Sequence, residues 1–133
     1  MPERSATATN LDIVRSFYDG LESGDFINPL DYFHESMTWY VSDFLPWGGE
    51  YEGLQDIRTM LRIMRSQLSD TFETDELIAS GNEVIAIGRC VGFVNETQEN
   101  FCARSVHVWR FSEGRAVSLA TYSDSDSPLS TLA

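Results

Sequence analysis

Hydrophobic positions recur every three or four residues in the N-terminal part of the chain and every second residue in the C-terminal part. The first spacing appears at Leu11, Val14, Phe17, Tyr18 and Leu21. It places these side chains on one face of an α-helix. The sequence therefore predicts a helix that is capped at Thr9 and ends before Gly24.

Two further helices and one strand are predicted before the main sheet. A short helix is expected from Asp25 to Phe33, with Pro29 tolerated only if it lies in the first turn. The clearest helix is expected at 54–68, since its apolar residues form a single stripe at three- and four-residue steps. Between them, 37–41 is predicted as a strand and 44–51 as an aromatic loop.

From Phe72 onward the hydrophobic period changes to two, which is typical of β-strands. Turn residues separate four predicted strands, at 72–79, 83–94, 101–112 and 115–124. Helices followed by an antiparallel meander indicate the α+β class, with three N-terminal helices packed on one face of a curved, mostly antiparallel sheet. We expect a single domain over residues 1–133, with a core at about 9–126 and flexible ends.

The alternation at 105–111 carries the strongest functional signal. It places Ser105, His107, Trp109 and Phe111 on one face of a strand, with two valines on the other. A titratable imidazole and an indole on one face indicate a strand that lines a pocket. The imidazole of His107 suits general acid–base catalysis near neutral pH, while the alternative is a hydrogen-bonded core histidine without chemistry.

The charged residues of the chain exclude several kinds of partner and mechanism. The chain has a net charge of −12 and contains no lysine. A field of this sign repels phosphate backbones and anionic lipids, so neither a nucleic acid nor a membrane is expected as a partner. A mechanism through a protein Schiff base is excluded because there is no lysine amine to form one. Without a long apolar run or a leader segment, the chain is expected to be cytoplasmic.

Cysteine and histidine are too sparse for a structural metal site. The chain contains two cysteines, Cys90 and Cys102, and two histidines, His34 and His107. None of them has the paired spacing of zinc ligands. Both cysteines are expected to be free thiols, and no metal or cofactor is predicted.

Several short motifs occur in a characteristic order. They are Ser23-Gly24-Asp25, Trp39 in the first strand, Tyr51-Glu52-Gly53, His107-Val108-Trp109-Arg110-Phe111 and Glu113-Gly114-Arg115. In this order and over about 9–126, the chain resembles the nuclear-transport-factor-2-like superfamily, and within it the SnoaL-like, ketosteroid-isomerase-related proteins. The resemblance implies a cone-shaped α+β barrel with a deep apolar pocket, and a homodimer packed through the outer sheet face. It implies no single activity, because the scaffold hosts enzymes and binding modules.

The catalytic sets known for this scaffold are only partly retained. Aligned with the steroid isomerases, the tyrosine position falls on Phe17, the base on Val41 and the oxyanion-hole aspartate on His107. Aligned with the epoxide hydrolases, Arg89 matches the arginine, but the carboxylate positions hold Val91 and Thr121. Polyketide-cyclase-like members use a single acid on the strand of His107, and this is the chemistry that the chain excludes least.

The predicted site contains His107 as the catalytic residue. The ligand-binding residues are expected to be Phe17, Trp39, Val41, Arg89, Ser105, Trp109 and Thr121. Arg89 faces the pocket only if the large side chains of its strand point inward. If they point outward, it is a surface or interface residue, an orientation slightly favoured here.

Two functions remain open for this pocket. One is a cofactor-free isomerase, cyclase or dehydratase-type enzyme that moves a proton on a small apolar substrate. The other is a non-catalytic ligand-binding or dimerisation module on the same fold. An enzyme is expected to hold His107 within hydrogen-bond reach of a second polar group that orients it, whereas a binding module has no such need.

Overall fold

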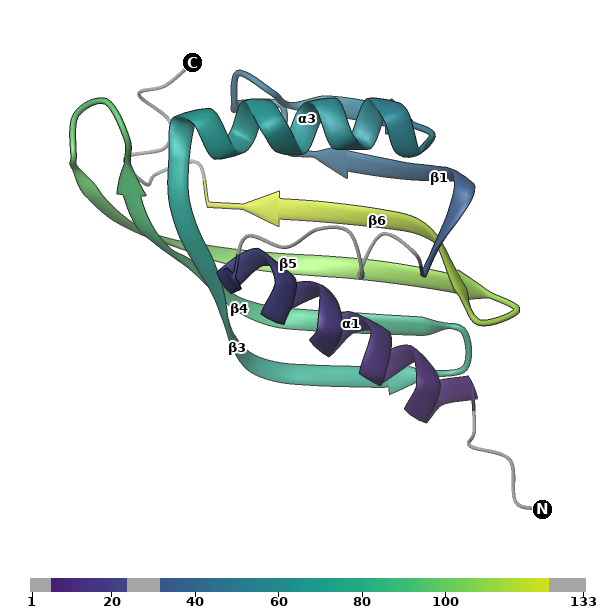
Figure 1. Cartoon of the computed structure of the whole chain (residues 1–133). Helices are drawn as coiled ribbons and strands as arrows, with labels where there is room; N and C mark the ends of the chain where they lie inside the picture. Colours follow the sequence, from purple (N-terminus) through teal and green to yellow (C-terminus); the bar gives the residue numbers. More distant parts are fainter. Residues whose placement is uncertain (1–5, 24–31, 125–133) are drawn as a thin grey trace.

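The computed structural model describes residues 6–23 and 32–124. Within them the chain forms two helices, α1 (Ala6–Ser23) and α3 (Leu54–Gln67). Its strands are β1 (Phe33–Val41), β2 (Gly49–Glu52), β3 (Leu68–Ser80), β4 (Glu83–Val94), β5 (Asn100–Ser112) and β6 (Arg115–Ser123). Both helices lie on the same face of one curved sheet (Figure 1).

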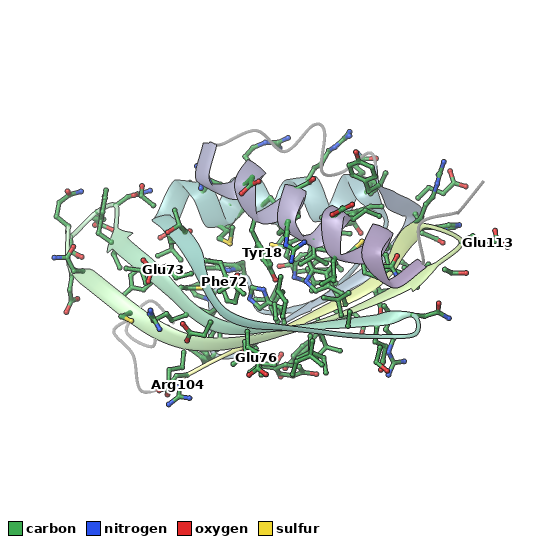
Figure 2. The ribbon with its side chains drawn as sticks, turned by 90° about the horizontal axis from the view of Figure 1, so that it is seen from below. Tyr18, Phe72, Glu73, Glu76, Arg104 and Glu113 are labelled. Carbon is green, nitrogen blue, oxygen red and sulfur yellow. The ribbon has the colours of Figure 1, made fainter. Side chains whose placement is uncertain are left out.

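The six strands form a single sheet in the order β2-β1-β6-β5-β4-β3. All neighbours are antiparallel except β1 and β6, which run parallel. The predicted α+β class and mostly antiparallel sheet are therefore confirmed. The predicted barrel is wrong in one respect, because β2 and β3 remain separate edges and the sheet does not close. Its concave face is covered by the helices instead (Figure 2).

Most predicted elements lie where the hydrophobic period indicated. The helix expected at 54–68 and the strands of the meander are shifted by only a few residues. The first helix begins at Ala6, so Thr9 lies inside it and does not cap it. The short helix expected at 25–33 lies outside the described residues, apart from Tyr32, which lies in a turn, and Phe33, which begins β1.

The loop expected at 44–51 is only partly a loop. Its last residues belong to β2, which pairs with β1 through Trp39 and Tyr51. This strand is short and alternates half-buried and exposed residues, so it has no apolar run of its own. Its pairing depends on the β1 edge, which the local sequence does not reveal.

Aromatic side chains fill the space between α1 and the sheet. Phe17 packs edge-on against Trp39 and Trp109, with ring centroids 5.6 Å and 5.2 Å apart. Phe33 joins them, 5.7 Å from Phe17 and 5.9 Å from Trp109. Edge-to-face pairs of this kind each add about 0.5–1.5 kcal/mol to the free energy of burial. The cluster joins α1 to β5 through side chains, and the residue after Phe17, Tyr18, reaches His107 of that strand.

Candidate functional site

A small cavity lies between the two helices and the concave face of the sheet. Its volume is about 80 Å³, well below the roughly 300–1,000 Å³ of pockets that enclose drug-sized ligands. It is lined by Phe17, Trp39, Val41, Leu45, Trp47, Met60, Met64, Leu68, Asp70, Phe72, Cys90, His107, Thr121 and Ser123. The wall is mainly apolar with a few polar groups, which is the usual composition of a small-molecule site.

His107 enters this wall from β5 and is held by a residue of α1. The hydroxyl of Tyr18 lies 2.7 Å from Nδ1 of His107, and both side chains are buried. The indole N–H of Trp109 donates to the same hydroxyl over 3.1 Å. Phe72 of β3 stacks on the imidazole, with ring centroids 4.3 Å apart. The ring of His107 is therefore fixed in both position and orientation.

The two hydrogen bonds determine which nitrogen of His107 carries the proton. Tyr18 has one proton to donate, and its oxygen already accepts from Trp109. The arrangement that satisfies every group has Tyr18 donating to Nδ1, so that Nε2 of His107 carries the hydrogen. Nε2 has no hydrogen-bond partner among the described residues. His107 thus offers an N–H donor to a ligand in the cavity.

Burial keeps both members of this pair neutral. It lowers the pKa of His107 to about 3, because a charged imidazolium loses its hydration in the apolar wall. Burial also raises the pKa of the Tyr18 hydroxyl, an effect only partly offset by the hydrogen bond from Trp109. At neutral pH the pair therefore acts as an uncharged donor chain.

The cavity also contains two acidic groups whose pKa values are raised. Asp70 of β3 lies two residues from Phe72 on the same wall, and burial raises the pKa of its carboxyl while Arg65 opposes the shift. Cys90 of β4 lies beside it, and burial, followed by the charge of Asp70, raises the pKa of this thiol to about 12. The thiol is thus protonated at neutral pH, and the apolar surroundings disfavour the charged form of Asp70.

Five of the eight predicted site residues line the cavity. They are Phe17, Trp39, Val41, His107 and Thr121. Ser105 and Trp109 are buried on the same face of β5 but do not reach the cavity wall. Trp109 instead contacts the site through Tyr18, and Ser105 donates to the carbonyl of Ala103 over 3.2 Å.

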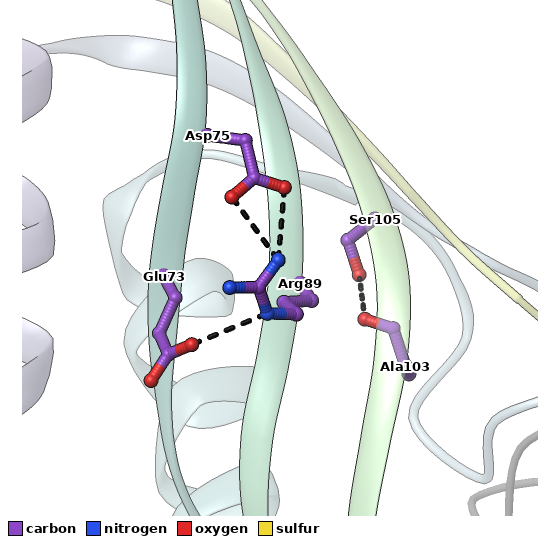
Figure 3. A network of polar contacts seen from close by, with 5 residues as sticks. All are labelled: Glu73, Asp75, Arg89, Ala103 and Ser105. Atoms are coloured by element: carbon purple, nitrogen blue, oxygen red, sulfur yellow. Dashed lines mark hydrogen bonds and ion pairs between the residues drawn. The ribbon is translucent and has the colours of Figure 1, made fainter.

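Arg89 does not belong to the site, which corrects its prediction as a ligand-binding residue. The small side of β4, with Ala86 and Cys90, faces the helices, so Arg89 lies on the outer face. There its guanidinium contacts Asp75 at 3.0 Å and Glu73 at 3.2 Å (Figure 3). Helix α1 packs close to β3 and β4, where the inner side of β4 carries small residues (Figure 1).

Three polar residues of the site were not predicted: Tyr18, Asp70 and Cys90. The helical spacing places Tyr18 on the buried face of α1, but nothing in that spacing reveals that its hydroxyl reaches β5. Asp70 precedes the predicted start of its strand, since β3 begins directly after α3. A carboxylate two positions before an alternating run was the one signal that could have identified it.

The described residues show neither a metal cluster nor a membrane-spanning helix. No group of three or more potential metal ligands occurs within 6–23 and 32–124. Neither α1 nor α3 is long and apolar enough to cross a bilayer.

Comparisons with solved structures show the fold. An NTF2-like protein of unknown function from Burkholderia pseudomallei superposes with a TM-score of 0.83 at 24% identity, covering 89% of this chain and 92% of that one. TerC, crystallised with polyporic acid, superposes at 0.80 with 20% identity, covering 89% and 93%. A candidate SnoaL-like polyketide cyclase from Jannaschia superposes at 0.80 with 10% identity, covering 93% and 92%.

Sequence comparisons place the chain in a family. No curated protein sequence matches it. The family model of the SnoaL-like domain, however, matches residues 14–119, which include the second half of α1, all of α3 and the strand that carries His107. With an NTF2-like fold and a cavity between helices and sheet, the chain belongs to the SnoaL-like domain family.

Proposed function

We propose that this protein is a cofactor-free enzyme that moves a proton on a small, neutral, mostly apolar substrate. One observation carries the proposal, namely the hydrogen bond from Tyr18 that fixes His107 in the cavity wall. A binding module has no need for an oriented imidazole, whereas acid–base and oxyanion-stabilising groups must be held in place. The reaction belongs to the isomerase, cyclase or dehydratase type.

His107 serves this chemistry as a neutral hydrogen-bond donor. The Nε2–H group stabilises negative charge that develops on a substrate oxygen when a neighbouring C–H bond is broken. A neutral donor stabilises an oxyanion without a proton equilibrium of its own near neutral pH, since the pKa of His107 is lowered to about 3 by burial. The apolar wall strengthens this interaction because water does not compete for the oxyanion.

The composition of the wall supports a neutral substrate. None of the residues that line the described cavity is an arginine, and the chain contains no lysine. An anionic substrate would face Asp70 without a cation to offset the repulsion. Aromatic side chains of Phe17, Trp39 and Trp47 suit a flat, apolar or aromatic compound.

A substitution at His107 tests the proposal with 5-nitrobenzisoxazole, a flat neutral compound. A base removes its ring C–H proton, and negative charge develops on oxygen as the ring opens. We expect His107→Ala to lower the catalysed rate by at least about 100-fold, the usual contribution of a positioned acid–base or donor group.

His34→Gln is the matched control, because His34 is the second histidine of the chain and contacts Ser36 on β1 away from the cavity. Its rate should equal that of the wild type. A wild-type protein that does not accelerate ring opening, or a His107→Ala variant that is as fast as the wild type, would contradict the proposal.

The alternative is a non-catalytic binding module that uses the same cavity. Such a module would bind 5-nitrobenzisoxazole, seen as quenching of the cavity tryptophans, without opening its ring. Substitution of His107 would then change affinity alone. His107→Ala and the control His34→Gln therefore distinguish an enzyme from a binding module.

We also propose that the protein is a homodimer packed through the outer face of the sheet and that it acts in the cytoplasm. Ile78, Val106 and Tyr122 are exposed there by 41%, 37% and 50%. The face also carries Arg89 and its two carboxylate partners, so it can pair with a second copy of itself about a two-fold axis. The free thiols suit a reducing compartment.

A further inference from the structure

Two serine hydroxyl groups form a short hydrogen-bond chain beside the cavity, on β5 and β6. The hydroxyl oxygen of Ser105 lies 3.1 Å from that of Ser123 and 3.2 Å from the carbonyl oxygen of Ala103. Figure 3 shows the second of these bonds. Ser105 is buried behind the cavity wall, whereas Ser123 is part of the wall itself. The chain therefore ends at a hydroxyl group that a ligand can contact.

The carbonyl of Ala103 determines the direction of this chain. A carbonyl oxygen has no hydrogen, so Ser105 donates in that bond and uses its one hydroxyl hydrogen. The Ser105 oxygen then accepts from Ser123, which uses the hydroxyl hydrogen of Ser123. The longer contact to the sulfur of Cys90, at 3.5 Å, keeps the same direction, because Ser105 is the donor there too. Ser123 therefore presents only oxygen lone pairs to the cavity.

The other hydroxyl group of the cavity wall, that of Thr121, bonds within the fold. It donates to the carbonyl of Tyr40 over 3.1 Å and accepts from the indole N–H of Trp39 over 3.5 Å. The Ser123 oxygen, by contrast, accepts no hydrogen bond from any described residue. Buried acceptors are normally satisfied, so the lone pairs of Ser123 call for a donor from a ligand or from water.

The strand register places Ser123 close to His107. On β5 and β6, His107 lies opposite Thr121, and Ser105 lies opposite Ser123. His107 and Ser123 are thus diagonal neighbours, which lie about 7–8 Å apart. One offers the Nε2–H donor and the other an acceptor, and both line the same cavity. This span, in a cavity of about 80 Å³, suits one ring with a polar group at each end.

Resting on the proposed function, we infer that Ser123 determines the substrate class of this site by accepting a hydrogen bond from the substrate. The substrate is a neutral single-ring compound with a carbonyl group at one end and a hydroxyl group at the other. Its carbonyl oxygen accepts from Nε2–H of His107, and its hydroxyl donates to the Ser123 oxygen. Ser105 is a positioning residue, because it acts on the substrate only through Ser123.

Two benzaldehydes serve as binding probes for this assignment. 4-Hydroxybenzaldehyde has both polar groups, whereas 4-fluorobenzaldehyde has a similar shape and cannot donate a hydrogen bond. Titrations followed by ¹H–¹⁵N NMR under weakly acidic conditions, which keep the phenol neutral, give the two dissociation constants. We expect the wild type to bind the hydroxyl compound about 10-fold more tightly, the order expected for one net hydrogen bond between neutral groups.

Ser123→Ala should abolish this preference, and Ser118→Ala is the matched control. Ser118 lies on the same strand, but its side chain points to the outer face, as that of Tyr122 does. Ser123→Ala leaves the backbone N–H of residue 123 bonded to the hydroxyl oxygen of Ser42, so β6 should keep its position.

The preference for the hydroxyl compound decides the assignment. Its presence in the wild type and in Ser118→Ala, together with its absence in Ser123→Ala, supports the assignment. A wild type that lacks the preference or binds neither compound overturns it. So does a Ser123→Ala variant that keeps the preference, because another acceptor, such as Asp70, then binds the hydroxyl. Ring opening of 5-nitrobenzisoxazole, which has no hydroxyl group, still tests the proposed function, so the two proposals can fail separately.

Ser105→Ala provides a second test, which holds even if Ser123→Ala does not fold. This substitution frees the hydroxyl hydrogen of Ser123, which can then be donated to a ligand. Terephthalaldehyde carries a carbonyl group at each end of its ring. We expect Ser105→Ala to bind it about 10-fold more tightly than the wild type does. Equal affinities would show that Ser105 does not set the direction of the chain, and would overturn the assignment.

Discussion

At the scale of single residues, three side chains explain the site. Trp109 donates to Tyr18, Tyr18 donates to His107, and His107 presents its remaining N–H to the cavity. Each group bonds the next, and within the described residues only Nε2–H at the end of the chain, on His107, remains for a ligand. Buried networks of this kind stabilise one arrangement only when every member is bonded. The same chain that orients the site therefore also contributes to the stability of the fold.

Tyr18→Phe should destabilise the protein by about 1–3 kcal/mol, because it leaves the Trp109 N–H and Nδ1 of His107 buried without a partner. The aromatic packing against Phe72 is kept in this variant, so the loss of stability measures the contribution of the Tyr18 hydroxyl alone. Urea unfolding followed by tryptophan fluorescence measures the change. Adding Phe72→Tyr to this variant is not expected to restore stability. A Tyr18→Phe variant as stable as the wild type would show that the hydrogen-bond network does not contribute to the free energy of unfolding.

The buried histidine also predicts how stability depends on pH. The pKa of His107 is lowered to about 3 in the folded protein, below the 6.5 of an exposed histidine. The unfolded state therefore binds the proton first, and the stability from His107 is complete above pH 6.5 and is lost as pH falls toward 3. Between pH 6 and 4, wild type should lose about 1.4 kcal/mol per pH unit more than His107→Gln.

Asp70 acts with the opposite sign, since its pKa is raised, but it contributes equally to both proteins and cancels in this comparison. Unfolding free energies at a series of pH values measure the difference. Parallel curves for the wild type and His107→Gln would mean that His107 titrates in the fold as it does in water.

Sequence periodicity predicted the positions of this site better than its chemistry. Alternation at 105–111 identified His107, and helical spacing placed Phe17 inward. The partners of His107 could not be predicted, since Tyr18 is 89 residues away along the chain and meets it only through the packing angle of α1. The orientation of Arg89 depended on strand register, which a loop of uncertain length leaves open by one residue.

At the scale of elements, β3 and β4 form the most constrained pair. A register shift between Thr74 and Glu76 indicates a β-bulge, which brings Asp75 to Arg89 on the outer face (Figure 3). On the inner face, Gly88 lies so close to β3 that a Cβ atom there would meet the carbonyl oxygen of Glu73. The small residues on this side of β4, including Gly88, let the sheet curve beneath α1.

Gly88→Ala should therefore destabilise the protein by about 1–3 kcal/mol, as expected for overpacking against a fixed backbone. The added methyl group meets backbone rather than a mobile side chain, so β3 itself has to move. Thermal unfolding followed by circular dichroism measures the effect. An unchanged melting temperature would indicate that the bulge absorbs the methyl group.

Elements with a continuous hydrophobic period were predictable, and those without one were not. The stripe of α3 and the alternation of β5 each turn their apolar residues to one side, so the period determines the element. β2 has four residues and gains its structure from pairing with β1. Its formation depends on an edge that exists only in the folded sheet.

At the scale of the whole molecule, the two faces of the sheet carry different kinds of surface. The concave face and the helices enclose the cavity, while the convex face exposes apolar side chains beside charged ones. Large exposed apolar groups on one face indicate a contact surface. The proposed dimer would cover this face without obstructing the cavity, which lies on the other side of the sheet.

Val106→Glu should convert the proposed dimer into a monomer, since it places a charge at the centre of the outer face opposite Tyr122. Light scattering coupled to size exclusion measures the molar mass. Ile63→Glu is the control, because Ile63 is exposed by 45% but lies on α3, on the other side of the sheet. A wild-type protein that elutes as a monomer at micromolar concentration would contradict the dimer.

His107 is thus proposed as a neutral donor that Tyr18 orients toward the cavity. Long-range ¹H–¹⁵N NMR of the two histidines, assigned with His34→Gln, measures which nitrogen of His107 carries the hydrogen and whether the ring is charged. We expect His107 to carry its hydrogen on Nε2 and to remain neutral throughout pH 5–8, because burial lowers its pKa to about 3. A His107 that titrates near 6.5, or carries its hydrogen on Nδ1, would contradict both the donor role and the proposed mechanism.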